Sequence, residues 1–193
     1  MMKPPQKPKV AVITLNYNQI DYTLDCVKSV LESDYTNFEI ILVDNGSSEE
    51  NFKSLIDRLP NDDRISIPRL KENQGYVGGI NYGLKEADKT NCDYFLIMNN
   101  DTLIDPKAIE ELVITSEKYQ GKAIVSGKVY NYDEKDTLQY IGNTFNKSKK
   151  GILDFKSPIK NRREKDIGQY DQEIEMAMTD DIMWVISRKI FKD

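Results

Sequence analysis

Residues 37–47 read NFEIILVDNGS, and this stretch decides the fold class of the chain. Its segment 38–43 is a nearly continuous apolar run, which is typical of a strand buried on both faces of a parallel sheet. Asp44 to Ser47 then end the strand with residue types that favour turns. Working outward, residues 10–15 form a second run of the same kind, and apolar residues follow it at helical spacing at positions 20, 24, 27 and 31.

The alternation of strand and helix patterns continues through the first two thirds of the chain. We expect further strands at 64–70, 93–98 and 123–130, and further helices around 52–59, 80–87 and 106–113. Pro68 places the third strand at an edge or ends it early. Ser47 or Ser48 can cap the second helix, and Pro106 fits the first position of the fourth. Repeated β-α units predict an α/β fold with a mostly parallel, Rossmann-like central sheet and helices on both faces.

The composition excludes several classes of function. The chain has 193 residues, a net charge of −5 and a pI of about 5.0, so we expect no nucleic-acid partner. It has no histidine, so acid–base chemistry falls to Asp, Glu, Lys, Tyr or Cys. Cys26 and Cys92 are expected to be buried free thiols in a reducing compartment. No segment approaches the ~20 apolar residues that span a bilayer. We therefore expect a cytoplasmic protein, with residues 1–8 as a flexible leader.

Polar residues follow the predicted strands, and ligands of such sheets bind at the carboxyl ends of the strands. Asp44 could accept hydrogen bonds from a nucleotide base or ribose, or residues 44–47 could simply form a turn and helix cap. Asn99-Asn100-Asp101 follows the strand at 93–98, where a carboxylate can reach Mg²⁺ or Mn²⁺ bridging two phosphates. The alternative for Asp101 is a cap that leads into the next helix.

Residues 73–83 contain four glycines, Gly75, Gly78, Gly79 and Gly83. A glycine-rich turn that enters a helix lets the backbone approach a ligand and points N–H groups at it. The segment matches neither the dinucleotide fingerprint nor the P-loop. The alternative interpretation is a glycine loop packed closely under a neighbouring strand.

The pattern changes after residue 130. Residues 146–166 carry eight Lys or Arg against three Asp or Glu, and residues 171–181 carry five acids and no base. The basic stretch 147–165, with Lys160, Arg162 and Arg163 close together, could contact anionic lipid or a phosphorylated acceptor. It could equally be a solvated loop. Residues 182–186 are expected to form a short buried strand or a helix start, and 188–193 to open a further helix.

Four of these segments, in this order and spacing, resemble family 2 glycosyltransferases with the GT-A fold. Residues 10–18 are similar to the family's opening strand and its Tyr-Asn signature, and 37–47 to the strand that ends in its nucleotide-binding Asp. The segment 73–83 resembles the N-x-G-x-x-x-G-x-N-x-G loop of the rhamnosyltransferase-like branch. Asn99-Asn100-Asp101 stands in the place of the D-x-D motif.

The resemblance implies a nucleotide-sugar-binding half over residues 9–130 and the start of an acceptor-side half over 131–193. It implies that Asp101 holds Mg²⁺ or Mn²⁺, with Asn99 where a first acid often stands, so the site has one carboxylate fewer. The donor-binding residues that it implies are Asn16, Tyr17, Asp44, Asn73, Gly75, Asn81 and Asn100. The departing nucleoside diphosphate gains negative charge, which a divalent metal neutralises.

The resemblance also implies inversion by a single displacement, with an acid as the base that activates the acceptor hydroxyl. In the family that acid follows a segment resembling residues 184–191, so we expect a C-terminally truncated chain whose base lies beyond Asp193. Asp180 and Asp181 are the nearest acids within the chain. A solvated acidic turn is the alternative interpretation for this pair.

Three functions remain open at this point. The first is a transferase that builds a glycan, and the second is a truncated module that binds nucleotide sugar without transfer. The third is a sugar nucleotidyltransferase. Such enzymes carry a glycine-rich loop that contains Arg and Lys after the first strand. This sequence has Asn16-Tyr17-Asn18 at that position, which argues against the third function. The donor would be dTDP-rhamnose or a UDP-hexose, and the acceptor a glycan or a lipid-linked sugar. A lipid-linked acceptor would place the protein in peripheral contact with the inner face of the membrane.

Overall fold

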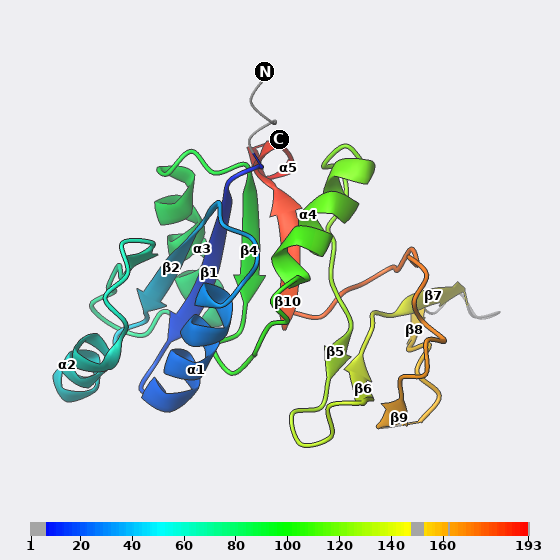
Figure 1. Cartoon of the computed structure of the whole chain (residues 1–193), viewed down its shortest axis with the longest axis horizontal. Coiled ribbons are helices and arrows are strands. Elements are labelled where there is room, and N and C mark those ends of the chain that lie inside the picture. The colour runs from blue at the N-terminus through cyan, green and yellow to red at the C-terminus, as the bar shows by residue number, and fades with distance from the viewer. Residues whose placement is uncertain (1–6, 148–152, 162, 193) are drawn as a thin grey trace. The chain divides into compact units, whose positions relative to one another are not determined.

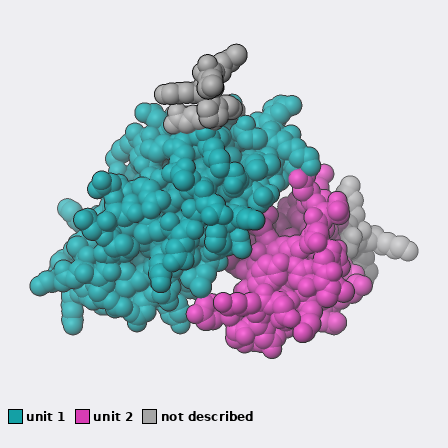
Figure 2. Space-filling model, viewed as in Figure 1, with its two compact units in different colours: residues 1–125, 185–193 teal, residues 126–184 magenta. Residues whose placement is uncertain are grey.

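The computed structural model describes residues 7–147, 153–161 and 163–192. The chain divides into two compact units, residues 1–125 with 185–193 and residues 126–184 (Figure 2). The sequence places the boundary at 130 and assigns every later residue to the second half. In the structure the boundary falls five residues earlier, and residues 185–193 return to the first unit. The predicted leader 1–8 lies almost wholly outside the described residues.

The first unit is built on a five-stranded sheet with the strand order β10-β4-β1-β2-β3 (Figure 1). β1, β2, β3 and β4 all run parallel to one another, as the buried apolar runs predict. β10 runs the opposite way (Figure 1): the Arg188 N–H, just after the end of β10, donates to the Asp93 carbonyl, just before the start of β4. The bounds are Val10–Asn16 for β1, Phe38–Asp44 for β2, Ile65–Ser66 for β3, Tyr94–Met98 for β4 and Met183–Ser187 for β10.

Helices cover both faces of the sheet, as predicted. Alternate residues of β1 face opposite sides. Ile13 contacts Gly83 of α3 on one side, whereas Thr14 faces Cys26 of α1 on the other. The helices are α1 (Ile20–Leu31), α2 (Glu49–Arg58), α3 (Gly75–Asp88), α4 (Ala108–Lys118) and α5 (Arg188–Lys192). In the described part of the chain, no helix has the length and apolar character to cross a bilayer.

Both cysteines are buried and free, as the sequence predicts. Burial raises the pKa of the Cys26 thiol to about 12 and that of Cys92 to about 11. Both thiols therefore stay protonated at neutral pH and act as small apolar core groups.

Two of the expected strands are much shorter than predicted. The strand expected at 64–70 is β3, which covers only Ile65–Ser66, with one further β-bridge between Arg69 and Asp44. Pro68 lacks an N–H for the ladder, which accounts for the interruption. The strand expected at 123–130 exists only as β5, Val129–Tyr130, plus a bridge from Val125 to Val185. The boundary between the two units falls inside this segment, so no single sheet can take up all of it.

Two helix starts also differ from the prediction. Helix α4 begins at Ala108, because the Asp105 carboxylate accepts from the Lys107 N–H and holds Pro106 in a preceding turn. The glycine-rich segment is not a turn before the helix: α3 begins at Gly75 and contains the other three glycines. Ser48, one of the two predicted caps, accepts a hydrogen bond from the Asn51 N–H at 3.2 Å and caps α2.

The glycines inside α3 permit close packing of the helix on the sheet. A Cβ at Gly79 would lie 2.8 Å from Leu15 Cδ1, and one at Gly83 would lie 2.6 Å from Ile13 Cγ2. Larger residues at these positions would push α3 away from β1. The close-packing interpretation of the glycines is therefore correct for these two positions.

The second unit contains short antiparallel strands. One sheet has the order β5-β6-β9, with β6 at Thr137–Tyr140 and β9 at Glu164–Lys165. A separate hairpin joins β7 (Thr144–Lys147) to β8 (Leu153–Lys156). The predicted basic stretch 147–165 supplies the second strand of this hairpin and all of β9, while residues 148–152 and Arg162 lie outside the described residues.

Candidate functional site

The carboxyl ends of β1, β2 and β4 lie side by side at one edge of the sheet. Asn16 is in register with Asp44 at the last positions of β1 and β2, and the segment 99–101 follows β4 on the other side of β1. Parallel neighbours end at the same edge, so three segments far apart in sequence meet there. This is the juxtaposition that the sequence predicts.

Asp44 is completely buried, and its carboxylate is surrounded by donors. Oδ1 accepts from Asn16 Nδ2 at 3.0 Å, while Oδ2 accepts from the Ser47 N–H at 3.3 Å and from Arg69 Nε at 3.1 Å. A buried carboxylate is tolerated only when such partners replace water. The Asp44 side chain is therefore held in one orientation at the end of β2.

Arg69 is the site residue that the sequence analysis missed. Its guanidinium bridges buried Asp44 and exposed Glu49, with 2.9 Å between Arg69 Nη1 and Glu49 Oε1. It also stacks on the Phe52 ring at 4.1 Å from the centroid. The hydrogen bond that Arg69 donates to Glu49 is the main cause that raises the pKa of Arg69 above its usual value. The sequence predicts a role for Arg69 only indirectly, because a carboxylate buried at the end of β2 needs a cation as its partner.

Asn16 lies beneath the site surface, whereas Tyr17 is 46% exposed above it. Asn16 Nδ2 donates to the Ser47 hydroxyl as well as to Asp44, and Asn16 Oδ1 accepts from Thr23 Oγ1 at 3.0 Å. All the polar atoms of the Asn16 side chain are thus engaged within the protein. Of this pair, only Tyr17 presents surface to a ligand.

The turn after β2 is tied to the start of α3. Asn45 Nδ2 donates to Asn73 Oδ1 and to the Gly75 carbonyl, both at 3.1 Å, and Asn73 Oδ1 also accepts from the Gly75 N–H. Gly46 has a φ of +78°, and a Cβ there would lie 2.4 Å from the Glu72 carbonyl carbon. Glycine is required at this position by both the backbone conformation and the close approach.

Asn81, another predicted donor residue, is exposed on α3, six residues after Gly75. That separation is about 9 Å along the helix axis. Asn81 therefore stands apart from the cluster that Asn45 and Asn73 form. Its contact with a donor stays a prediction.

The segment after β4 has Asp101 at the surface and Asn99 and Asn100 partly covered. The Asn99 carbonyl accepts from the Thr102 N–H, which closes a turn, and Asn100 Nδ2 donates to Thr23 Oγ1 at 2.8 Å. Within the described residues, no group of three or more His, Cys, Asp or Glu side chains is placed to hold a metal. Asp101 thus offers one exposed carboxylate, two residues after the partly covered Asn99.

Asp180 and Asp181 belong to the second unit. The Asp181 N–H donates to Asp180 Oδ1 at 2.9 Å. A hydrogen bond with Asp180, together with burial and the repulsion between the two carboxyls, raises the pKa of Asp181. A carboxyl with a raised pKa is a stronger base once ionised. A catalytic role for this pair stays a prediction.

The family profile described as Glycosyl transferase family 2 matches residues 11–193. The match covers nearly the whole chain, so the chain belongs to glycosyl transferase family 2. The strand ends that the sequence singled out are therefore those of a glycosyltransferase domain.

Curated relatives agree with this assignment. The chain is 28% identical over 127 residues to glycosyltransferase GlyG of Streptococcus pneumoniae, which covers 66% of this chain and 41% of that protein. It is 33% identical over 92 residues to poly-beta-1,6-N-acetyl-D-glucosamine synthase of Staphylococcus aureus, which covers 48% of this chain and 21% of that one. The chain thus spans less than half the length of these relatives.

Two solved structures show the same fold. A mannosyltransferase from Pyrobaculum calidifontis, in complex with GDP-Man and Mn²⁺, superposes with a TM-score of 0.55 at 18% identity, covering 66% of this chain and 37% of that one. S. aureus TarS 1–349 in complex with UDP-GlcNAc gives a TM-score of 0.52 at 20% identity, covering 69% and 40%. The predicted GT-A fold is confirmed, with its mostly parallel sheet between helices.

Proposed function

We propose that this chain carries the donor-binding half of an inverting glycosyltransferase. It would move a sugar from a nucleoside-diphosphate donor to a hydroxyl of a glycan or a lipid-linked acceptor. The single observation that carries the proposal is the polar edge of the sheet, where Asn16, Asp44 and the segment 99–101 meet in a family 2 chain. A location in the cytoplasm, with the acceptor presented at the inner face of the membrane, is part of the same proposal.

The nucleoside end of the donor would bind beside Arg69 and Tyr17. Asp44 is fully buried and already holds three donors, so in this arrangement it presents Arg69 to the ligand. Arg69 keeps 27% of its side chain exposed, which leaves donor capacity for a base carbonyl. The half-exposed ring of Tyr17 can stack on a base. Asn73 and Gly75 would then lie near the diphosphate or sugar.

The residues after β4 fit a divalent ion that is bound together with the donor. Asp101 and Asn99 offer hard oxygen ligands of the kind that Mg²⁺ and Mn²⁺ prefer. A single carboxylate holds such an ion weakly, so the diphosphate oxygens would complete its coordination. When bound, the ion supplies neutralisation of the charge that develops on the departing diphosphate.

Both dTDP-rhamnose and UDP-hexoses remain candidate donors. The glycine-rich segment 73–83 supports the rhamnosyltransferase-like branch, whereas a UDP-hexose is consistent with the TarS complex that contains UDP-GlcNAc. The second candidate function is a nucleotide-sugar-binding module without transfer.

Thermal unfolding with UDP, dTDP and GDP, each with and without Mn²⁺, tests the proposal. A ligand that binds only the folded state stabilises it by ~2.7 kcal/mol at 100 times its dissociation constant. We expect a metal-dependent rise in melting temperature with one of the three. Asp101→Ala should remove the metal dependence, whereas Asp57→Ala, which removes an exposed acid from α2, should not.

The absence of any shift in the unmutated chain would contradict the donor site. Where one nucleotide does bind, mass spectrometry of sugar transfer to a simple acceptor separates the two candidate functions. If Asp181→Asn abolishes sugar transfer but still binds the nucleotide, the result would support Asp181 as the base. Binding without transfer would favour the binding module.

A further inference from the structure

Helix α1 presents three small polar side chains along one face, Thr23, Cys26 and Ser29. Positions spaced by three residues lie on the same side of a helix. All three contact the segment 99–104, which follows β4 and carries Asp101. One face of α1 therefore holds the segment that the proposed function assigns to metal and diphosphate binding.

Each of the three contacts involves a different part of that segment. Thr23 Oγ1 accepts from Asn100 Nδ2 at 2.8 Å, and Ser29 Oγ accepts from the Ile104 N–H at 3.2 Å. Cys26 Sγ lies 3.7 Å from the Asn99 carbonyl oxygen, a weak contact for a thiol donor. The two hydroxyl contacts are thus the stronger ones, at either end of the segment.

Thr23 differs from Ser29 because it also contacts the network around Asp44. Its hydroxyl lies 3.0 Å from Asn16 Oδ1, and Asn16 Nδ2 donates to Asp44 Oδ1 at 3.0 Å. Thr23, Asn16 and Asp44 are all almost completely buried. A continuous line of hydrogen bonds thus runs from Asn100 through Thr23 and Asn16 to Asp44.

We propose that Thr23 is a positioning residue of the donor site. Its hydroxyl fixes the segment 99–101 relative to Asp44. The residues proposed to bind the diphosphate of the donor are thereby held at a constant distance from the residues proposed to bind its nucleoside. Thr23 itself does not touch the donor. This inference rests on the proposed function, since it assigns both ends of the line to one nucleotide.

The chemistry of a hydroxyl explains why this position needs Thr or Ser. The Thr23 oxygen accepts from Asn100 while its proton is shared between Asn16 Oδ1 and the Gln19 carbonyl at 2.8 Å. Valine has the same shape and can neither donate nor accept. It would leave the Asn16 oxygen and the Asn100 amide without their partner in buried surroundings.

The test compares Thr23→Val with Thr23→Ser and with the matched control Ser29→Ala. The probe is whichever of UDP, dTDP and GDP binds the unmutated chain most tightly, titrated calorimetrically at a series of Mn²⁺ concentrations. We expect Thr23→Val to weaken nucleotide binding about tenfold and to raise the half-saturating Mn²⁺ concentration by a similar factor. Thr23→Ser should restore both to within about twofold.

Ser29→Ala removes a hydrogen bond to the same segment and leaves the hydrogen bonds between Asn100 and Asp44 intact. It should therefore lower the melting temperature but leave the half-saturating Mn²⁺ concentration near its original value. Thr23→Val that melts earlier but keeps normal binding would overturn the proposal. So would a serine variant as weak as the valine one, or a Ser29→Ala variant with the same raised Mn²⁺ requirement. If the unmutated chain binds none of the three nucleotides, the proposed function itself fails, and this inference with it.

Discussion

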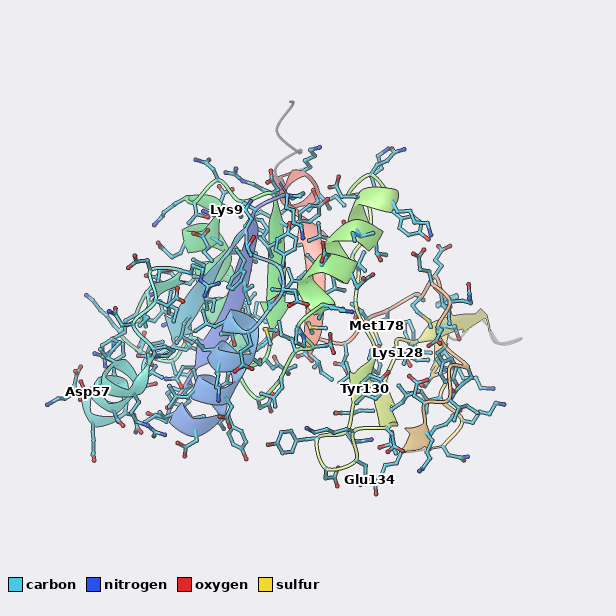
Figure 3. The ribbon with its side chains drawn as sticks, in the orientation of Figure 1. Lys9, Asp57, Lys128, Tyr130, Glu134 and Met178 are labelled. Carbon is cyan, nitrogen blue, oxygen red and sulfur yellow. The ribbon has the colours of Figure 1, made fainter. Side chains whose placement is uncertain are left out.

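In the first unit the polar groups at the ends of β1 and β2 are buried and mostly neutral, whereas the second unit holds clusters of charged side chains. Asn16, Thr23 and Asp44 lie under the sheet edge and exchange hydrogen bonds of fixed geometry. In the second unit, Lys128 pairs with both Asp166 and Asp171, at 2.8 Å and 2.5 Å. Figure 3 shows Lys128 and Tyr130 on the same segment, and the Tyr130 hydroxyl donates to Asp166.

The difference follows from how much apolar surface each unit can bury. Strands β1, β2 and β4 of the first unit are almost entirely buried, and Leu138 is the only large side chain of the second unit that is fully buried among the described residues. A small apolar core leaves more of the stability to polar contacts. We infer that pH and salt act on the second unit through these charge clusters more than they act on the buried hydrogen bonds at the ends of β1 and β2.

Asp44→Ala should be the most damaging change in the first unit. It leaves the Arg69 guanidinium and the Asn16 amide without their buried acceptor, at a cost of about 3 kcal/mol. Hydrogen exchange resolved by peptides should show faster exchange in residues 10–44 and unchanged exchange in 128–171. The control Asp57→Ala should shift stability by no more than about 0.5 kcal/mol. Equal loss in both units would show that they unfold together.

Gly83→Ala tests the packing of α3 on the sheet. The added methyl group would lie 2.6 Å from Ile13 Cγ2 and 3.0 Å from Val43 Cγ2, so the core must shift. We expect a net loss of about 2 kcal/mol, because overpacking outweighs the better helix propensity of alanine. Denaturant unfolding measures this loss. Lys85→Ala, at an exposed position of the same helix, should be neutral, and a neutral Gly83→Ala would show that α3 can move outward freely.

Asp166→Asn should affect the second unit alone. The hydrogen bonds from Lys128 and then Tyr130 lower the pKa of Asp166 to about 2. Its pKa in the unfolded chain is about 4, so the ionised carboxylate stabilises the folded state above about pH 4 and this stability is lost between about pH 4 and pH 2.

The expected loss for Asp166→Asn is about 1 kcal/mol at neutral pH, because solvent screens part of the interaction. Hydrogen exchange in residues 128–140 as a function of pH measures it. Asp136→Asn, which breaks the exposed pair with Lys165, serves as the control and should have little effect. Protection factors in this unit, corrected for the intrinsic pH dependence of amide exchange, that do not change between pH 5 and pH 2.5 would contradict the assigned role.

Ser48→Ala gives the smallest expected effect and tests the N-terminal cap of helix α2 in the first unit. The Ser48 hydroxyl accepts from the Asn51 N–H, and its loss should cost about 0.5–1 kcal/mol. Ser48→Asp keeps an acceptor at the cap and should retain the stability. Thermal unfolding of the two variants, compared with the unmutated chain, measures the difference. If alanine and aspartate behave alike, the cap contributes nothing to α2.

The sequence predicted the centre of the fold better than its edges. The runs at 10–15, 38–43 and 93–98 are apolar at nearly every position, and only a strand buried on both faces requires that pattern. Pattern alone predicted too much at 64–70 and 123–130, where Pro68 and the boundary between the units interrupt the ladder. The glycines of 73–83 favour a turn because glycine has a poor intrinsic helix propensity, yet helix α3 contains all four of them.

The sequence by itself determined that polar residues end β1, β2 and β4 and that these ends share one edge, because parallel strands joined by crossover helices leave no other arrangement. Only the tertiary structure decided which of those residues are buried and which remain at the surface. Arg69 reaches Asp44 and Thr23 reaches both Asn16 and Asn100 through contacts between segments far apart in the chain. Hydrogen-bond partners of this kind depend on distance and direction in space, which no local pattern of residues encodes.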